Sequence, residues 1–382
     1  MRRPGRVAVV GAGCAGLSLA CALVERWQDV DLAVHDARSE FGYDRTWCGW
    51  TFEDSAWSEL VERRWPAWSV RAGGRTVRVT CPDHPYRLIR SDRFYAAARA
   101  RLESAPGVTL ALGTPVRDVR REASGPVVET ASGNEAYDHV FDGRPVAAEP
   151  EPVDRPRLWQ HFEGLVVEME AATFPEDTVT LMDFDVDQKE GLHFMYVLPL
   201  SDRRALVEAT FMTPEPPTEL SYESRITTYL RARWYRPRFR TLHREAGCIP
   251  MDGRCYARRP APGIWRIGTA GGVVKPSTGY AFDAIQRDTA RMVEAYESGA
   301  AEPPPVRSSA VWRLDRIFLG FLARHPEAGP LLFRDMFARV TPERLVRFLC
   351  ERATWRDRLA VMRAMPRLRF ARHAAETWRE WV

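Results

Sequence analysis

Three closely spaced glycines and a later acid are the residues of this chain that most clearly indicate chemistry. The segment 11–16 has the sequence GAGCAG and follows the apolar run Val7–Val10, and an acid comes shortly after a second apolar run, Val30–Val34. In such a pattern one glycine makes a tight turn, one lets the backbone approach a pyrophosphate, and one lets the next helix pack on the sheet. The segment therefore predicts a bound dinucleotide, and with it redox chemistry; a turn that binds nothing is the alternative. The predicted contacts are Gly11, Gly13, Ala15, Gly16 and Asp36.

A carboxyl in apolar surroundings is the next candidate. Glu208 has the neighbours Leu206, Val207 and Phe211. Burial raises the pKa of a carboxyl, so that it keeps its proton and can serve as a general acid. The alternation of Val207 with Glu208 also fits a half-exposed strand whose glutamate faces water. From the residues alone, the exposed glutamate is the favoured interpretation.

Asp183 is a weaker candidate for a catalytic carboxyl. It could orient Glu208 across neighbouring strands or assist the return of a proton. Strand alternation places Asp183 on one face with Asp185 and Asp187, so a solvated acidic face is the favoured alternative. No group of residues has the spacing of metal ligands, and no metal is predicted.

Two kinds of sheet are needed to position these residues. The glycine turn requires a βαβ unit, to which later strands return the chain. Between residues 160 and 211, short apolar runs alternate with Gly, Pro, Asp and Ser, which predicts an antiparallel sheet with one covered face. Helices are predicted over 17–24, 91–102 and 279–298, strands over 108–112, 127–130, 140–144, 164–170, 178–185, 192–199, 204–211 and 263–268, and a helical tail after the linker 301–305.

Composition places the chain among ordinary globular proteins. It has 382 residues, of which 45% are hydrophobic and 28% charged, and its formal net charge is +4. This charge is too small for a chain of this length to indicate binding to nucleic acid. The seven cysteines are scattered, with no CxxC pair, so a cytoplasmic protein with reduced thiols is expected.

A second glycine-rich region carries a resemblance to a known family. Residues 268–272 (GTAGG) and 276–280 (PSTGY) are similar to the second FAD-contacting segment of the flavoprotein hydroxylase superfamily. Thr269 stands where most hydroxylases have an acid, and the segment resembles instead that of the bacterial lycopene β-cyclases. Further segments that resemble this family follow in order: Arg45–Cys48, Met182–Gln188, Phe194–Ser201, Leu206–Thr210 and the tail from Phe318 to Leu349.

The resemblance implies an α/β fold with three parts. A Rossmann-type FAD-binding domain is expected over residues 1–60, 88–150 and 255–300, and an antiparallel β-sheet domain for substrate over 61–87 and 151–254. Residues 301–382 are expected to form a helical C-terminal region. The further cofactor contacts implied are Asp142, Gly268, Gly271, Gly272, Thr278, Gly279 and Tyr280, and the implied substrate contacts are Trp47 and Tyr196.

The resemblance also implies a reaction, the cyclisation of lycopene or a similar isoprenoid polyene. Protonation of a terminal alkene, ring closure through a carbocation and loss of a proton leave a β-ionone ring without net oxidation. FAD is implied to act in its reduced form, with NAD(P)H as reductant, by stabilising the cation. Glu208 matches the family's glutamate and is the implied acid, whereas Ala209 stands where some relatives have a second, adjacent carboxylate.

Other functions remain open at this stage. A FAD-dependent monooxygenase would share the fold but would consume NAD(P)H and oxygen. A cyclase of another terpenoid or of a prenylated natural product would share the cation chemistry. A flavin or isoprenoid binder without catalysis is the remaining alternative.

The insolubility of a polyene leads to an expectation about location. An enzyme that acts on such a substrate must take it from a bilayer, so we expect peripheral association with the inner face of the cell membrane. Apolar faces of the Arg-rich tail helices could lie at an anionic interface, and packing of these faces on the body of the protein is the alternative. The residues concerned are Leu345, Phe348, Leu349, Trp355, Leu359 and Met362.

Overall fold

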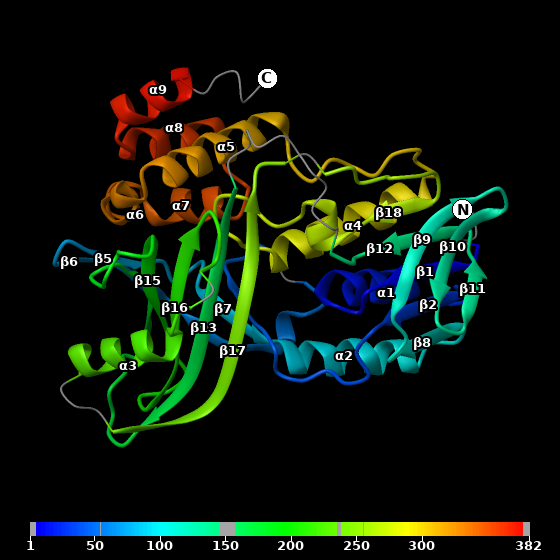
Figure 1. Ribbon diagram of the computed structural model, residues 1–382, viewed down its shortest axis with the longest axis horizontal. Coiled ribbons are helices and arrows are strands. Elements are labelled where there is room, and N and C mark those ends of the chain that lie inside the picture. The colour runs from blue at the N-terminus through cyan, green and yellow to red at the C-terminus, as the bar shows by residue number, and fades with distance from the viewer. Residues whose placement is uncertain are drawn as a thin grey trace.

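The computed structural model describes residues 5–53, 55–145, 157–217, 219–234, 238–254 and 256–376. Its parts are a parallel sheet with helices, a large antiparallel sheet, and a group of C-terminal helices (Figure 1). This arrangement confirms the predicted fold class.

The parallel sheet has five strands in the order β18-β12-β1-β2-β8. Their bounds are β1 (Val7–Val10), β2 (Leu32–Asp36), β8 (Val108–Leu112), β12 (His139–Asp142) and β18 (Ile264–Arg266). All four pairings are parallel. The central strand β1 is wholly buried, which explains its uninterrupted apolar sequence.

Both faces of the parallel sheet are covered. Helix α1 (Cys14–Arg26) contacts α2 (Ser91–Glu103) and α4 (Phe282–Glu297), and the three share a core with the sheet. An antiparallel sheet of three strands provides a second core, in which Val128 and Tyr137 pack with Ala8 and Val10 of β1. Its strands are β9 (Val116–Glu122), β10 (Gly125–Thr130) and β11 (Gly133–Ala136).

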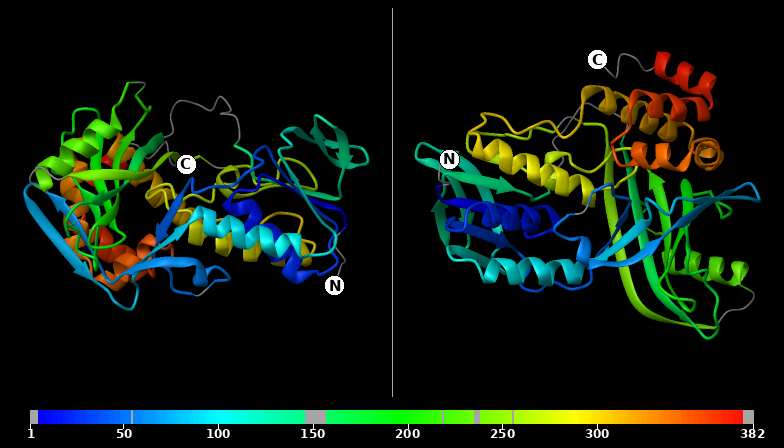
Figure 2. Two further views of the ribbon diagram at one scale, coloured as in Figure 1. Left: turned by 90° about the horizontal axis from the view of Figure 1, so that it is seen from below. Right: turned by 180° about the vertical axis from the view of Figure 1, so that it is seen from behind.

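The larger antiparallel sheet has seven strands in the order β17-β13-β16-β15-β14-β5-β6. Neighbours are antiparallel except β14 and β5. The long strands β13 and β17 curve together through the middle of the molecule, and helix α3 (Tyr222–Arg233) covers one face (Figures 1 and 2). The bounds are β5 (Ala67–Ala72), β6 (Arg75–Thr80), β13 (Arg157–Met169), β14 (Thr178–Asp183), β15 (Leu192–Pro199), β16 (Arg204–Thr213) and β17 (Phe239–Asp252).

A small third sheet lies at the junction of the parts. It has the order β3-β7-β4, with β3 (Thr46–Gly49), β4 (Val61–Trp65) and β7 (Tyr86–Arg90). Short 3-10 helices occur at Ser58–Leu60, Gly268–Gly271 and Pro326–Ala328.

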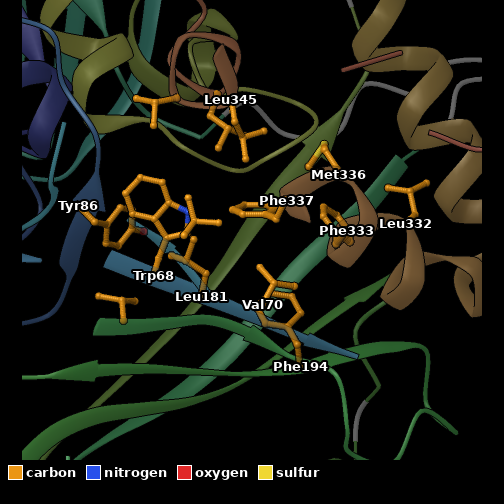
Figure 3. Close-up of a cluster of buried hydrophobic side chains, with 14 of the residues drawn as sticks. Trp68, Val70, Tyr86, Leu181, Phe194, Leu332, Phe333, Met336, Phe337 and Leu345 are labelled. Atoms are coloured by element: carbon orange, nitrogen blue, oxygen red, sulfur yellow. The ribbon is translucent and has the colours of Figure 1, made fainter. Parts of the chain in front are cut away.

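The C-terminal helices pack on the face of the large sheet opposite α3. In the core between them, side chains of α6 point toward Trp68, Val70 and Phe194 of the sheet (Figure 3). Leu345 and Leu349 of the tail are buried here, and Phe348 packs against the same core. The helices are α5 (Ser309–Arg324), α6 (Gly329–Arg339), α7 (Pro342–Leu349), α8 (Trp355–Ala364) and α9 (Arg367–Glu376).

The sequence did not predict the strands β3 to β7 or the strand β17, which carries Glu245. This strand lies at the edge of the sheet, so most of its side chains are exposed or half-buried and alternation is weak. It contains four charged residues, namely Arg240, Arg244, Glu245 and Asp252. Only its pairing with β13 over thirteen register positions shows that it is a strand.

A buried ion pair joins the loop before α4 to the C-terminal helices. Lys275 and Asp315 are 3% and 2% exposed, and Nζ lies 2.8 Å from Oδ1 and 3.0 Å from Oδ2. Removal of one partner leaves the other charge buried, whereas an apolar replacement of both avoids that cost.

We therefore expect Asp315→Leu to lower the free energy of unfolding by about 3–5 kcal/mol, measured by urea denaturation. The double variant Lys275→Met with Asp315→Leu is expected to recover most of this loss. A double variant as unstable as the single one would show that the changed side-chain shape, and not the uncompensated charge, lowers the free energy of unfolding.

Candidate active site

One large cavity connects the three parts of the molecule. Its volume is about 1050 Å³, and its lining runs from the glycine turn at Gly11 to the C-terminal helices at Phe337. Glu208 of β16 lies in its wall. Six residues of the apolar cluster in Figure 3 also line it: Tyr86, Leu181, Phe194, Phe333, Met336 and Phe337.

The glycine turn combines tight packing with an open backbone. Gly11 has φ +95°, which favours glycine. A Cβ on Gly16 would lie 1.8 Å from the carbonyl oxygen of Gly11, whereas a Cβ on Gly13 would have no atom within 4 Å. Gly16 thus lets α1 pack on β1, and Gly13 leaves space at the N-terminus of that helix. Gly11, Gly13, Ala15 and Gly16 all line the cavity, as the predicted cofactor contacts require.

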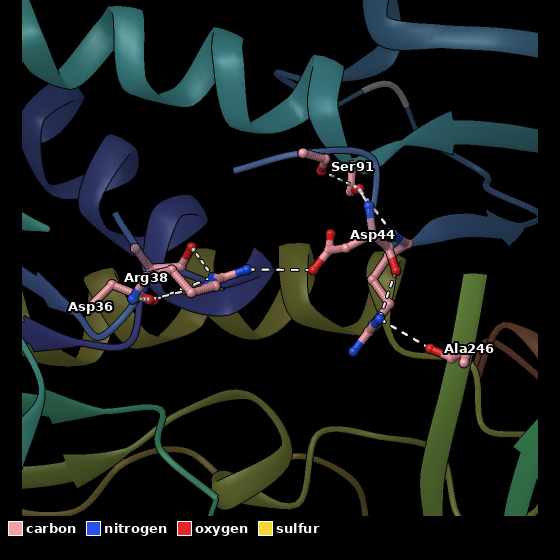
Figure 4. A network of polar contacts seen from close by, with 8 residues as sticks. Asp36, Arg38, Asp44, Ser91 and Ala246 are labelled. Atoms are coloured by element: carbon pink, nitrogen blue, oxygen red, sulfur yellow. Dashed lines mark hydrogen bonds and ion pairs between the residues drawn. The ribbon is translucent and has the colours of Figure 1, made fainter. Parts of the chain in front are cut away.

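The carboxylate of Asp36, at the end of β2, hydrogen-bonds to the backbone of the glycine turn. Asp36 accepts the N–H of Ala12 at 2.6 Å and pairs with Arg38 at 3.1 Å (Figure 4). Burial alone would raise the pKa of Asp36, but the hydrogen bonds and charge of Arg38 and the N–H of Ala12 hold it below its ordinary value. Arg38 lines the cavity, and Asp36 is not among the residues that do.

A chain of polar contacts continues from Arg38 to the large sheet. The Arg38 guanidinium lies 3.5 Å from Asp44, and the backbone N–H groups of Asp44 and Arg45 donate to the hydroxyl of Ser91. The Arg45 side chain then donates to the carbonyl of Ala246 on β17 (Figure 4). These contacts fix the segment that carries residues 45–48 between the two sheets.

The second glycine-rich region contributes to the cavity in part. Gly268 and Gly279 have φ values of +59° and +72° and line the cavity together with Thr278 and Tyr280. Gly271 and Gly272 do not. A Cβ on Gly271 would lie 2.6 Å from the carbonyl oxygen of Arg266, so this glycine permits backbone packing.

Asp142 is placed differently from the expectation for a cofactor contact. Its carboxylate pairs with Arg144 at 2.9 Å, and it is absent from the cavity lining, whereas the next residue, Gly143, is part of it. The cavity edge is therefore formed by Gly143, the residue after the predicted contact Asp142.

Glu208 meets a second buried glutamate that the sequence analysis did not identify. In the sheet register, Gly164 of β13 pairs with Glu208 on one side and with Glu245 of β17 on the other. A Cβ on Gly164 would lie 2.8 Å from Cγ of Glu208 and 3.3 Å from Cγ of Glu245, so the two side chains meet over the glycine. Each glutamate is 7% exposed, and both line the cavity. The exposed position favoured by the residues alone is therefore wrong for Glu208.

This environment holds the proton on Glu208. Burial first, and then the charge and hydrogen bond of Glu245, raise the pKa of Glu208 well above its ordinary value. Glu245 in turn accepts a hydrogen bond from the Thr46 hydroxyl at 2.6 Å. A contact between residues 37 positions apart, made across a third strand, leaves no pattern in the sequence.

Three tyrosines surround the cavity wall next to Glu208. The hydroxyl of Tyr86 lies 2.9 Å from that of Tyr196 and 3.3 Å from that of Tyr280. Tyr196 is also the register partner of Glu208 on β15. The structure thus brings together the predicted contacts Tyr196 and Tyr280, and adds Tyr86 from β7.

Trp47 lies in the cavity wall on the cofactor side. Its ring packs against Phe94, Tyr95 and Phe282, with ring centroids 5.2, 5.8 and 5.4 Å away. Trp47 is therefore held by the core of the parallel-sheet domain while one part of it lines the cavity.

Asp183 is not brought to Glu208. It is 1% exposed, accepts a hydrogen bond from Tyr229 of α3 at 3.1 Å, and lies 4.0 Å from both Arg71 and Arg233. A register shift near the end of β14 interrupts the alternation on which its predicted position depended. Asp183 is absent from the cavity lining, and it is buried under α3, so neither the assisting role nor the solvated face agrees with its position.

Two features are absent from the described residues. Within these residues, no three or more His, Cys, Asp or Glu side chains are grouped so as to hold a metal ion. No helix among them combines the length and apolarity needed to cross a bilayer.

Comparison with known families identifies the chain. The model of the family described as "Lycopene cyclase protein" matches residues 6–375. The chain belongs to this family. Curated relatives include a lycopene beta-cyclase of Pseudescherichia vulneris, 27% identical over 321 residues that cover 81% of this chain and 77% of the relative. A chloroplastic neoxanthin synthase of Solanum tuberosum is 25% identical over 349 residues, which cover 82% and 66% of the two chains.

Solved structures of other proteins have the same fold as this member of the lycopene cyclase family. HpxO of Klebsiella pneumoniae, solved in complex with FAD, superposes with a TM-score of 0.62 at 14% identity, over 95% of this chain and 99% of that one. The parallel sheet, the antiparallel sheet and the C-terminal helices therefore form the same fold as this FAD-complexed protein.

The glycine turn yields a matched pair of substitutions. Gly16→Ala places a methyl group against the Gly11 carbonyl, so we expect it to lower the free energy of unfolding of the apoprotein by about 1–3 kcal/mol. Gly13→Ala meets no atom, and we expect the apoprotein to keep its stability within about 0.5 kcal/mol but to lose FAD affinity at least tenfold.

Urea denaturation and FAD fluorescence titration measure these two quantities. Equal FAD affinity in wild type and Gly13→Ala would contradict the assignment of this turn to the cofactor.

Proposed function

We propose that this protein is an FAD-dependent carotenoid cyclase that converts the linear ends of lycopene, or of a similar isoprenoid polyene, to β-ionone rings without net oxidation. The observation that supports this most strongly is Glu208, a buried carboxyl in the wall of a largely apolar cavity, where burial and Glu245 raise its pKa well above the ordinary value. Membership of the lycopene cyclase family makes a polyene the natural substrate class.

Glu208 has the properties needed to start the reaction. Its proton forms a new C–H bond at the terminal alkene, whose electron pair is used for that bond, and a cation results at the neighbouring carbon. Attack by a second double bond closes the ring, and loss of a ring proton leaves the β-ionone double bond. Atoms and electrons balance, so the product has the mass of the substrate.

The walls of the cavity protect this cation from water. Tyr86, Tyr196 and Tyr280 on one side, and Phe333 and Phe337 of α6 on the other, offer π faces to a positive charge. The three tyrosine hydroxyls are joined by hydrogen bonds, and Phe333 and Phe337 are buried in the apolar core, so this part of the wall would present rings to the cation.

The residues of the glycine turn fit an FAD. The open backbone at Gly13, the N-terminus of α1 and the Arg38 side chain would hold its phosphates, and Gly268 and Gly279 would allow close approach of its rings. When bound in its reduced, anionic form, with NAD(P)H as the proposed reductant, FAD would supply negative charge near the cation.

A single anaerobic assay tests this proposal. Purified protein with FAD, NAD(P)H and lycopene in liposomes is expected to give a product of unchanged mass that carries β-ionone rings, as identified by chromatography and mass spectrometry. Glu208→Gln cannot donate the proton, and we expect its rate to fall at least about 100-fold.

The control variant for this assay is Glu163→Gln. Glu163 precedes Gly164 on β13 but is absent from the cavity lining, so the same isosteric change should leave the rate within about twofold. A product that gains oxygen would indicate a monooxygenase, and full activity of Glu208→Gln would remove the proposed acid.

We also propose that the protein lies on the inner face of the cell membrane, where a polyene is available. The apolar surface that remains for such contact is smaller than the sequence suggested, since Leu345 and Leu349 are buried and Phe348 packs against the core. Trp355 and Met362 of α8 are 67% and 43% exposed, and the neighbouring Arg356 and Arg363 are exposed as well.

Loss of these two apolar side chains should weaken binding to vesicles that contain anionic lipid. We expect Trp355→Ala with Met362→Ser to lower the partition coefficient about tenfold in a flotation assay. Leu242→Ser is the control, because Leu242 is 42% exposed on β17, away from α8. Equal flotation of the double variant and wild type would show that α8 is not the contact.

A further inference from the structure

Glu245 is a second carboxyl in the cavity wall, and the cyclisation described above does not use it. It reaches Glu208 only because Gly164 stands between them. Along the row Tyr196, Glu208, Gly164, Glu245, each residue is the register partner of the next on the neighbouring strand. Any larger residue at 164 would place atoms where the two side chains now meet.

The hydrogen bonds around the pair make the two carboxyls unequal. The Thr46 hydroxyl donates to Oε2 of Glu245 at 2.6 Å. The Tyr43 hydroxyl lies 2.8 Å from that of Thr46, and because the Thr46 proton is directed at Glu245, Tyr43 must be the donor. A chain of two donors therefore ends on the Glu245 carboxyl, which accepts the hydrogen bond from Thr46.

Glu208 has apolar surroundings, in contrast to the hydrogen-bond donors around Glu245. Its neighbours Leu206, Val207 and Phe211 are fully buried, and its hydrogen-bond partner is Glu245. Two carboxylates in one dry site cannot both be charged without a large cost, so such a pair holds one proton. The donors on Glu245 assign that proton to Glu208.

We propose that Glu208 and Glu245 act as one acid–carboxylate pair, in which Glu245 is the charged positioning residue that keeps the proton on Glu208, and Gly164 is the gap that allows the pair to form. The role in catalysis depends on the proposed function, but the pair itself does not. It replaces the arrangement of two adjacent carboxylates that Ala209 excludes.

The pair also closes the proton balance of the reaction. When Glu208 gives its proton to the alkene carbon, both members are carboxylates beside a cation. The proton that leaves the ring carbon goes to the pair, while the C–H electrons form the ring double bond. The pair thus ends the cycle with one proton, and no oxidant or reductant is consumed by these steps.

Other titratable groups near the pair stay neutral in the relevant pH range. Burial, as the first cause, raises the pKa of Cys48, Tyr196 and Tyr43. Farther out, the Arg90 guanidinium lies over the ring of Tyr43 at 4.3 Å, and His243 stacks on the same ring at 4.2 Å. Glu245 is therefore the neighbour whose charge acts on Glu208.

The test is the pH at which the enzyme loses activity, in wild type and in a Glu245 variant. A cyclase that needs protonated Glu208 is active below the raised pKa and loses activity as the pH rises through it. In Glu245→Gln the like charge is removed, so the pKa of Glu208 falls and the alkaline limb of kcat/KM moves to lower pH. We expect activity near that of wild type at about pH 6 and a loss of about tenfold or more at about pH 8.

Infrared spectroscopy of the protein without substrate measures the pair directly. The carbonyl stretch of a protonated, buried carboxylic acid is expected at neutral pH in wild type and in Glu163→Gln, and is expected to be missing in Glu208→Gln. In Glu245→Gln the band should titrate away at lower pH than in wild type. Gly164→Ala, which separates the carboxyls, should move the band in the same direction.

The outcomes separate this inference from the proposed function. A wild type without the band, or a band whose midpoint is the same in Glu245→Gln, would overturn the pair. A uniform loss of activity in Glu245→Gln at every pH, with an unmoved limb, would assign Glu245 a purely structural role and would also overturn it. If lycopene is not cyclised but the band behaves as expected, the pair stands and the substrate is wrong.

Discussion

The candidate site depends on the burial of Glu208 beside a second glutamate, Glu245, in the large sheet. A glutamate in water loses its proton near pH 4, so a carboxyl that still carries a proton at neutral pH must be shielded from water and close to a negative charge. Glu208 meets both conditions, because strands cover it on each side and Glu245 meets it over Gly164. The large sheet must therefore be intact for the acid to exist at all.

The other parts of the molecule complete this site from outside the sheet. The segment of residues 43–48 supplies the donor to Glu245 and the indole of Trp47, and it is fixed through Arg38 and Ser91 to the parallel-sheet domain. The C-terminal helices close the apolar end of the cavity with Phe333 and Phe337. The candidate cofactor site and Glu208 are thus joined by hydrogen bonds and packing.

The local elements were predictable to the extent that their burial is uniform or periodic. The strand before the glycine turn is apolar throughout because it is buried on both faces, and the helix after it begins at Cys14, close to the expected start. Strands β15 and β16 follow the predicted bounds within a few residues. Strand β17 escaped prediction because an edge strand with charged side chains lacks such a pattern.

The sequence by itself determined the glycine turn and much of the succession of sheets and helices, because each depends on residues close together in the chain, and the family resemblance gave Glu208 as the candidate acid. Only the tertiary structure decided that Glu208 is buried, that Glu245 is its partner, and that Asp183 belongs to the opposite face. The physical reason is that a pKa is set by dielectric surroundings and nearby charge, and these come from strands that lie far apart in sequence and meet only in the folded sheet.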